Sequence, residues 1–294
     1  MSQQGQIRVG ISGWRYDDWR GTFYPEGLAQ KRELEFASRK LNSIELNGTF
    51  YSTQKPQSFQ SWRKDTPDDF VFAIKGSQFI THIRKLENVE GALANFLAQG
   101  MLCLGRKLGP ILWQLPPQTS FNAEKIEAFL KLLPHMHKQA AAYAKQRDEW
   151  MAGRCWLEAE EDLPFRHAME SRHKSFATPE YIELLRKYNV ALVVADSVKW
   201  PVMMDVTADF VYCRLHGSEK LYPDGYTAEA IDTWGRRMIA WSRGEEVTDG
   251  HRIHLEPGPK QDARDVFVYF DDDNKVRAPH DAQSMSARIR ELSS

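Results

Sequence analysis

Eight short apolar segments that end in polar residues recur along the chain and alternate with segments of helical periodicity. The clearest is FVYCRLHG at 210–217. Tyr212, Arg214 and His216 share one face of this strand, because successive side chains point to opposite sides. The residues between them form the other face, which suits packing under helices. Such alternation predicts a parallel sheet, and eight units in 294 residues predict a closed (β/α)8 barrel.

Helical segments join the predicted strands. The strands are expected at 7–13, 43–51, 70–76, 109–117, 168–173, 190–196, 210–217 and 265–271. The helices are expected at 31–41, 56–64, 89–108, 122–133, 138–151, 179–188, 228–243 and 282–292. Residues 135–166 interrupt the alternation and are too few for a core of their own. We therefore predict an α/β protein with a single TIM-barrel-like domain over 1–294 and a helical insertion between strands 4 and 5.

The charge balance bears on the partners of the protein. Lys and Arg number 39 against 40 for Asp and Glu, a net charge of -1, so no strong overall field favours polyanions. We expect a small molecule as the ligand, and neither nucleic acid nor a membrane. The three scattered cysteines are typical of reduced thiols. With no apparent signal peptide or membrane span, they predict a cytoplasmic protein, whose oligomeric state the sequence leaves open.

The predicted strand ends carry the candidate site, because barrel enzymes build theirs at the carboxyl ends of the strands. Polar residues there are Ser12, Glu45, Asn47, Lys75, Gln114, Glu170, Arg172, Asp196, Arg214, His216, Tyr269 and Asp271. Glu45, Glu170 and Asp196 are the candidates for acid and base, since carboxylates facing cations across one cavity acquire shifted pKa values. His216 is the candidate for moving a proton near neutral pH.

The cations at these ends suggest an anionic substrate. Lys75, Arg172 and Arg214 would hold a phosphate or carboxylate group, with arginine suited to bidentate contact. The alternative is that these charges are interior ion pairs that close the top of the barrel, because buried charges need partners whether or not they act. For Glu170 and Arg172, two positions apart on one strand, both interpretations stand.

A divalent metal is the sharper alternative. Carboxylates at these ends, together with His82 and His216, are suitable ligand types. However, the chain has no HExxH motif, and three neighbouring cations would oppose a metal. We therefore expect no resident cofactor and keep a metal-dependent hydrolase or isomerase as the alternative.

Aromatic residues follow the first two predicted strands. Trp14, Tyr16, Trp19, Phe50 and Tyr51 would either stack on a sugar or base or form a hydrophobic lid. We assign the first role to Trp14 and Tyr16 and the second to Trp19 and Phe50. The chain contains no P-loop, GxGxxG or GxSxG motif.

Taken in order, these motifs resemble those of the DUF72 family, also called YecE-like or UPF0759 proteins. The resemblance covers nearly the whole chain, through GISGWRYDDWRGTFYP, SIELNGTFY, VFAIKGSQFITH, LGPILWQLPP, MESRHKSF, VVADS, VYCRLHG and VYFDDDNKVRAPHDA. It implies a TIM-barrel-like fold without a defined reaction. Its motif positions are Gly13, Trp14, Tyr16, Glu45, Asn47, Tyr51, Lys75, His82, Gln114, Glu170, Arg172, His173, Asp196, Arg214, His216, Gly217, Tyr269 and Asp271.

The chain departs from the family pattern at two motifs. Ser171 stands where the fifth-strand motif often has phenylalanine, and Asp271 and Asp272 stand where the eighth-strand motif commonly contains asparagine. We predict an enzyme that uses acid–base chemistry on a small anionic or sugar-like substrate in a pocket at the strand ends. The alternatives are the metal-dependent hydrolase or isomerase and a non-catalytic protein that binds a ligand or nucleic acid.

Overall fold

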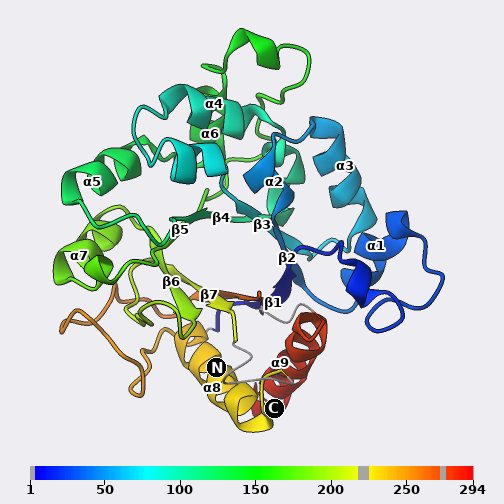
Figure 1. Cartoon of the computed structure of the whole chain (residues 1–294), viewed down its shortest axis with the longest axis vertical. Helices are drawn as coiled ribbons and strands as arrows, with labels where there is room; N and C mark the ends of the chain where they lie inside the picture. Colours follow the sequence, from blue (N-terminus) through cyan, green and yellow to red (C-terminus); the bar gives the residue numbers. More distant parts are fainter. Residues whose placement is uncertain (1–3, 218–224, 272–275, 294) are drawn as a thin grey trace.

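The computed structural model describes residues 4–217, 225–271 and 276–293, and its centre is a closed barrel of parallel strands (Figure 1). The strands pair in sequence order, and β1 closes the barrel against β8. They are β1 (Ile7–Ser12), β2 (Ser43–Leu46), β3 (Val71–Lys75), β4 (Leu108–Gln114), β5 (His167–Glu170), β6 (Ala191–Asp196), β7 (Phe210–Leu215) and β8 (Asp265–Phe270). The predicted (β/α)8 fold is confirmed.

Helices surround the barrel on its outside (Figure 1). The α-helices are α1 (Glu33–Ala37), α2 (Gly48–Tyr51), α3 (Pro56–Asp65), α4 (Glu90–Ala98), α5 (Ala123–Leu132), α6 (His137–Ala144), α7 (Pro179–Lys187), α8 (Ala228–Ser242) and α9 (Ala278–Ser293). The chain also forms short 3-10 or π helices: η1 (Asp17–Trp19), η2 (Gln30–Arg32), η3 (Phe79–Ile83), η4 (Met101–Lys107), η5 (Glu149–Met151) and η6 (Lys174–Phe176). Asn122 and Thr178 cap α5 and α7, since their side chains accept from the amides of Lys125 and Tyr181.

Two hydrophobic layers follow from the alternation of side chains along the strands. Inside the barrel lies a small cluster that includes Leu112, Phe210, Tyr212 and Tyr269. A much larger cluster, to which Cys213 and Leu215 belong, fills the space between the strands and the helices. The predicted faces of β7 are therefore confirmed. Because every strand runs in the same direction, all carboxyl ends meet at one mouth of the barrel.

Several predicted elements have other bounds in the structure, and two of them show the physical reason. The predicted strand 43–51 ends at Leu46, and α2 follows, because the Thr49 hydroxyl donates to the Leu46 carbonyl (3.1 Å) and to the Lys75 carbonyl (2.7 Å). The predicted helix 89–108 is divided into α4 and η4 at Gly100, whose φ is 122°. A Cβ there would lie 2.6 Å from the Cα of Pro56, so this close approach requires glycine.

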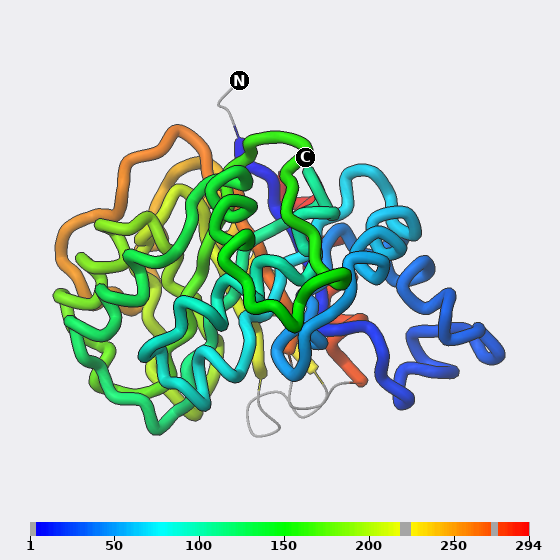
Figure 2. Tube along the Cα trace, turned by 90° about the horizontal axis from the view of Figure 1, so that it is seen from above, coloured from blue at the N-terminus to red at the C-terminus, as the bar shows by residue number. Residues whose placement is uncertain are grey.

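Residues 135–166 hold α6 and η5 between α5 and β5. Seen from above in Figure 2, this green segment lies beside the cyan α4, which packs on α6. Met136 pairs with Pro164, and the Trp156 amide donates to the Ala98 carbonyl (2.8 Å), so the segment is tied to itself and to α4. In the described part of the chain, no helix is long and apolar enough to cross a membrane.

Candidate functional site

Arg214, near the carboxyl end of β7, lies at the centre of a group of ions inside the barrel mouth. Its Nε donates to Glu45 Oε2 (3.1 Å) and its Nη2 to Glu45 Oε1 (2.9 Å), which makes a bidentate contact. Nη1 donates to Glu170 Oε2 (2.7 Å), and Nη2 also donates to Asp271 Oδ2 (2.6 Å). We call these four residues the Arg214 cluster. Arg214, Glu45 and Glu170 are fully buried, with side chains 0% exposed.

Hydroxyl groups complete the contacts of Glu45. Tyr212 donates to Oε2 (2.6 Å) and Ser12 to Oε1 (2.6 Å), while the Asn47 amide donates to Ser12 Oγ (2.8 Å). Below them, Tyr269 Oη lies 2.7 Å from Ser43 Oγ. The Glu45 carboxylate is thus held on both oxygens by groups from β1 and β7.

The charges of the Arg214 cluster shift the pKa values of Glu170 and of the neighbouring His216. Burial opposes ionisation of Glu170, but Arg214 and Arg172 outweigh it and hold the pKa of this carboxyl at about 2. Burial and the charge of Arg214 lower the pKa of His216 to about 4, against the opposite effect of Glu170 and Asp271. At neutral pH Glu170 is therefore a carboxylate, and the imidazole of His216 beside the cluster is neutral.

His216 lies beside the cluster. Its Nε2 is 3.7 Å from Glu170 Oε1 and its Nδ1 is 3.6 Å from Asp271 Oδ2. Both distances exceed those of hydrogen bonds. The ring also meets Trp200 edge to face, with 5.0 Å between centroids. This predicted catalytic residue is thus a buried base within reach of two carboxylates and bonded to neither.

Three further predicted residues form the outer edge of the mouth, and we call Lys75, His82 and Arg172 the rim. Lys75 ends β3 and its Nζ lies 4.6 Å from the ring centroid of Phe50. His82, on η3, meets the same ring edge to face at 5.1 Å. Arg172 donates through Nε to Glu170 (2.5 Å), and its guanidinium lies 4.1 Å from the ring centroid of Trp200.

The rim groups also influence one another electrostatically. Burial and the nearby charge of Arg214 lower the pKa of Lys75 to about 8, more than Glu45 and Asp271 raise it. Burial, followed by the charges of Lys75 and Arg172, lowers the pKa of His82. The rim therefore includes an amine that titrates near neutral pH beside an imidazole that stays neutral there.

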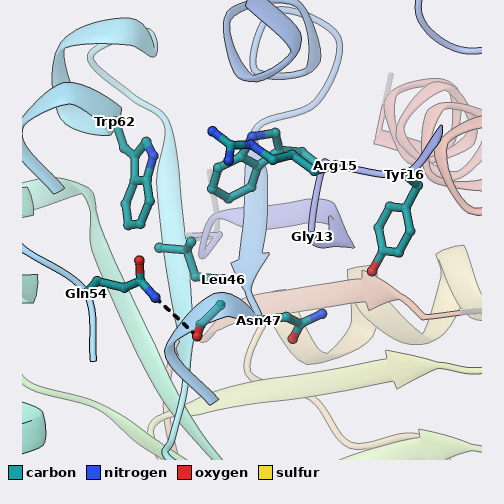
Figure 3. Close-up of a pocket in the computed structure, with 9 residues that line it drawn as sticks. Gly13, Arg15, Tyr16, Leu46, Asn47, Gln54 and Trp62 are labelled. Atoms are coloured by element: carbon teal, nitrogen blue, oxygen red, sulfur yellow. Dashed lines mark hydrogen bonds between the residues drawn. The ribbon is translucent and has the colours of Figure 1, made fainter. Parts of the chain in front are cut away.

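A cavity of about 260 Å³ opens beside the mouth at the ends of β1 and β2 (Figure 3). It is lined by Gly13, Trp14, Arg15, Tyr16, Leu46, Asn47, Gly48, Gln54 and Trp62. Trp14 meets Trp62 edge to face at 5.6 Å, and Asn47 links this cavity to Ser12 of the mouth. Tyr16 donates to the Ser12 carbonyl (2.8 Å), and burial and then the charge of Asp271 raise its pKa to about 12. Trp14, Tyr16 and Asn47 thus share one cavity.

Asp196 requires a correction, because it does not face the mouth. In the pairing of β6 with β7, Ala195 lies opposite Arg214, while Asp196 lies opposite Leu215 on the outward face. Its carboxylate accepts from Tyr226 Oη (2.8 Å), and its pKa is raised by burial. The polar strand end was correctly located in the sequence, but its side chain projects to the other side of the barrel wall.

Two more predicted residues, His173 and Gln114, belong to neither the Arg214 cluster nor the rim. His173 binds locally: its Nδ1 accepts from the Ser175 amide (3.2 Å) and caps η6. Gln114 ends β4 opposite Glu170 and is buried. The structure gathers most of the remaining predicted residues into the Arg214 cluster, the rim and the cavity, while His216 lies beside the cluster and Tyr269 contacts Ser43.

Several residues of the site were missed as functional candidates. Tyr212 holds Glu45 together with Ser12, which the sequence did place at a strand end, and the alternation of side chains that located Arg214 on its strand also signals Tyr212. Trp200, which lies against both Arg172 and His216, is in a segment without periodicity, so no sequence pattern indicates it. Arg15, Gln54 and Trp62 are brought to the cavity only by the fold.

The residues of the mouth do not suit a resident metal ion. Within residues 4–217, 225–271 and 276–293, no three His, Cys, Asp or Glu side chains are grouped as a metal site. The three carboxylates of the Arg214 cluster all bond the same guanidinium, whose positive charge takes the place that a metal ion would have. A metal ion here would have to displace a fully bonded arginine, so we derive no metal-dependent step.

Comparison with known proteins identifies the family of this barrel. Residues 8–293 match the family described as "Protein of unknown function DUF72", and the chain belongs to that family. It is 23% identical to the UPF0759 protein YunF of Bacillus subtilis over 297 residues, which cover 95% of this chain and 93% of YunF. It is 30% identical to the UPF0759 protein YecE of Escherichia coli K12 over 131 residues, 44% of either chain.

Solved structures of relatives show the same fold. A DUF72 family protein from Thermotoga maritima superposes with a TM-score of 0.71 and 23% identity, over 98% of this chain and 100% of the other. One from Enterococcus faecalis superposes with a TM-score of 0.65 and 17% identity, over 98% and 99%. At these identities the likeness concerns the fold alone. The resemblance seen in the sequence motifs is confirmed.

Proposed function

We propose that the protein is an enzyme that transfers protons to or from a small anionic substrate bound at the rim. The observation that carries this proposal is the contrast in bonding between the cations of the mouth. Arg214 donates to carboxylates through every nitrogen of its guanidinium. Lys75 and Arg172 face the mouth with donors that no described residue accepts, and those donors are available to a ligand.

Under this proposal Arg214, Glu45 and Glu170 position other residues rather than contact the substrate. The sequence suggested Arg214 as an anion-binding group and Glu45 and Glu170 as acid and base. All three are fully buried, and both carboxylates are bonded to Arg214, so a substrate has no access to them. We assign them to positioning: they hold Asp271 and, through Glu170, the guanidinium of Arg172.

Lys75 is the group best suited to proton transfer. A general acid or base works best when its pKa lies near the working pH, and the pKa of Lys75 is lowered to about 8. Arg172 has the geometry to bind a carboxylate or phosphate, since its Nη atoms are free of described partners and its plane is fixed against Trp200. The cavity lined by Trp14 and Asn47 would take the uncharged part of the substrate.

Binding tests the proposal first. Small sugar acids, phosphorylated metabolites and 2-oxo acids would be screened by thermal shift, and the compounds that stabilise the protein measured by calorimetry. We expect Arg172→Gln to weaken binding roughly 10- to 100-fold, the range for a hydrogen bond to a charged group. The matched control is Arg236→Gln, an exposed arginine on α8 that pairs with Asp232. Equal affinity of both variants would overturn the proposal.

Turnover tests the catalytic part. A compound that binds would be incubated with the protein and followed by NMR for product or for exchange of a carbon-bound proton with solvent. Lys75→Met should retain binding and lose turnover. Tight binding without any conversion would instead support the non-catalytic alternative, and full turnover in Lys75→Met would remove Lys75 from the chemistry.

A further inference from the structure

We infer that Lys75 is a nucleophilic amine, which forms an imine with the carbonyl carbon of a small 2-oxo carboxylate held at the rim. This inference rests on the proposed function and adds a substrate class and a covalent step to it. The surroundings of the Lys75 side chain differ from those of Lys107, a second lysine with a largely buried side chain in the same barrel.

Lys107 shows how a structural lysine is accommodated in this protein. Its ammonium group donates to the carbonyls of Arg63 (2.7 Å) and Thr66 (2.8 Å), and its side chain is 9% exposed. A charged ammonium carries three donors, and these acceptors compensate for its removal from water. The Lys107 ammonium group thus has acceptors in the protein, although burial still lowers its pKa.

Lys75 has no such acceptors. Among the described residues, no oxygen accepts a hydrogen bond from its Nζ and no carboxylate forms an ion pair with it, because the carboxylates of the mouth face Arg214. Its immediate neighbour is the face of Phe50. An apolar wall with guanidinium groups nearby favours the free amine, the environment that activates a lysine nucleophile. The lowered pKa agrees with this geometry.

The backbone presents this amine in a fixed place. Lys75 is the last residue of β3, and its carbonyl accepts from the Thr49 hydroxyl (2.7 Å). The side chain is partly exposed at the mouth, so a ligand can reach it. Arg172 on the same rim supplies the guanidinium that a carboxylate requires, and an anion bound there would place its carbonyl group at the mouth.

The step balances without a further reactant. The lone pair of Nζ forms a bond to the carbonyl carbon, and the carbonyl oxygen takes a proton to give a carbinolamine. The hydroxyl then leaves as water when it takes a second proton, and the nitrogen and carbon form the double bond. The two protons are those that the nitrogen loses in the two stages. His82, a neutral imidazole at the rim, is the group suited to carry them.

Trapping by reduction tests the inference. The whole protein would be incubated with glyoxylate and sodium cyanoborohydride at neutral pH, and labelled lysines mapped by mass spectrometry. A fall in pKa from 10.5 to about 8 raises the free-amine fraction by about two orders of magnitude. We expect Lys75 to be labelled at least about tenfold faster than exposed Lys131, since a weaker base is also a weaker nucleophile.

Two variants separate the inference from the proposed function. Lys75→Arg should abolish the fast labelling, and Arg172→Gln should slow it. Uniform labelling of Lys75 and Lys131 would overturn the imine. If calorimetry shows anions bound through Arg172 while Lys75 labels no faster than Lys131, the imine is wrong and the proposed function stands. If Lys75 is labelled fast but Arg172→Gln changes neither the labelling rate nor the affinity for anions, the proposed binding of an anionic substrate through Arg172 is wrong instead.

Discussion

The Arg214 cluster and the rim lie at the same mouth and contain the same kinds of charged group, yet they differ in how those groups are bonded. In the cluster, a fully buried guanidinium donates to carboxylates from β2, from β5 and from the end of β8. At the rim, Lys75 has no described acceptor and Arg172 uses only its Nε. The comparison teaches that charged residues at the strand ends can be bonded to one another, as in the cluster, or can keep donors without a described acceptor, as at the rim.

The largest expected effect is on the centre of the cluster. Arg214→Ala would leave Glu45 and Glu170 buried without their cation, which typically costs about 3–5 kcal/mol of unfolding free energy. Urea unfolding followed by circular dichroism measures it. Arg236→Ala on the surface of α8 is the control and should change stability by less than about 0.5 kcal/mol. A loss below about 1 kcal/mol for Arg214→Ala would mean that the cluster is not the structural unit described here.

A smaller effect is expected from His216, which should make the cluster sensitive to acid. Its pKa is lowered to about 4 from 6.5, so the unfolded chain binds a proton that the folded protein does not in this range. The stability due to this group is present above pH 6.5 and is lost as the pH falls toward 4. Wild type and His216→Gln should differ by about 1.4 kcal/mol per pH unit there. The charges nearest the ring are those of Arg214, Glu170, Asp271 and Arg172.

Unfolding midpoints at several pH values measure this difference. Other buried histidines, His167 among them, titrate in the same direction, so the slope of one curve is not diagnostic. The diagnostic quantity is the difference between the two curves. Parallel curves for the wild type and His216→Gln would show that His216 remains protonated in the folded protein.

The smallest effect on stability is expected at the rim. Lys75→Met keeps the apolar stem over Phe50 and removes an amine without an acceptor, so the free energy of unfolding should change by less than about 1 kcal/mol or rise slightly. Lys107→Met is the matched variant. It leaves the carbonyls of Arg63 and Thr66 buried without a donor and should cost about 1–3 kcal/mol. Thermal unfolding of the two variants side by side compares them, and an equal loss would show that Lys75 is structural as well.

Much of this site was predictable from the sequence, and the one wrong orientation, that of Asp196, has a clear physical reason. Alternation along each strand located Arg214 on the inner face and collected Glu45, Glu170 and Lys75 at one end of the barrel. The same reasoning misplaced Asp196, because the face of a strand's last residue depends on register, and pairing with β7 turns Asp196 outward. One position along a strand exchanges the two faces.

The sequence by itself determined the fold, since the period of its apolar residues specifies strands and helices and their alternation specifies a closed parallel barrel. It also indicated most of the polar residues that lie at the mouth, although Asp196 turned out to face outward. Only the tertiary structure decided which charges neutralise each other. Arg214 meets Glu45 across 169 positions and Glu170 across 44, contacts set by barrel closure and strand register rather than by neighbourhood in the chain. That pairing bonds the carboxylates of the mouth to Arg214, while the Nζ of Lys75 and the Nη atoms of Arg172 have no acceptor among the described residues.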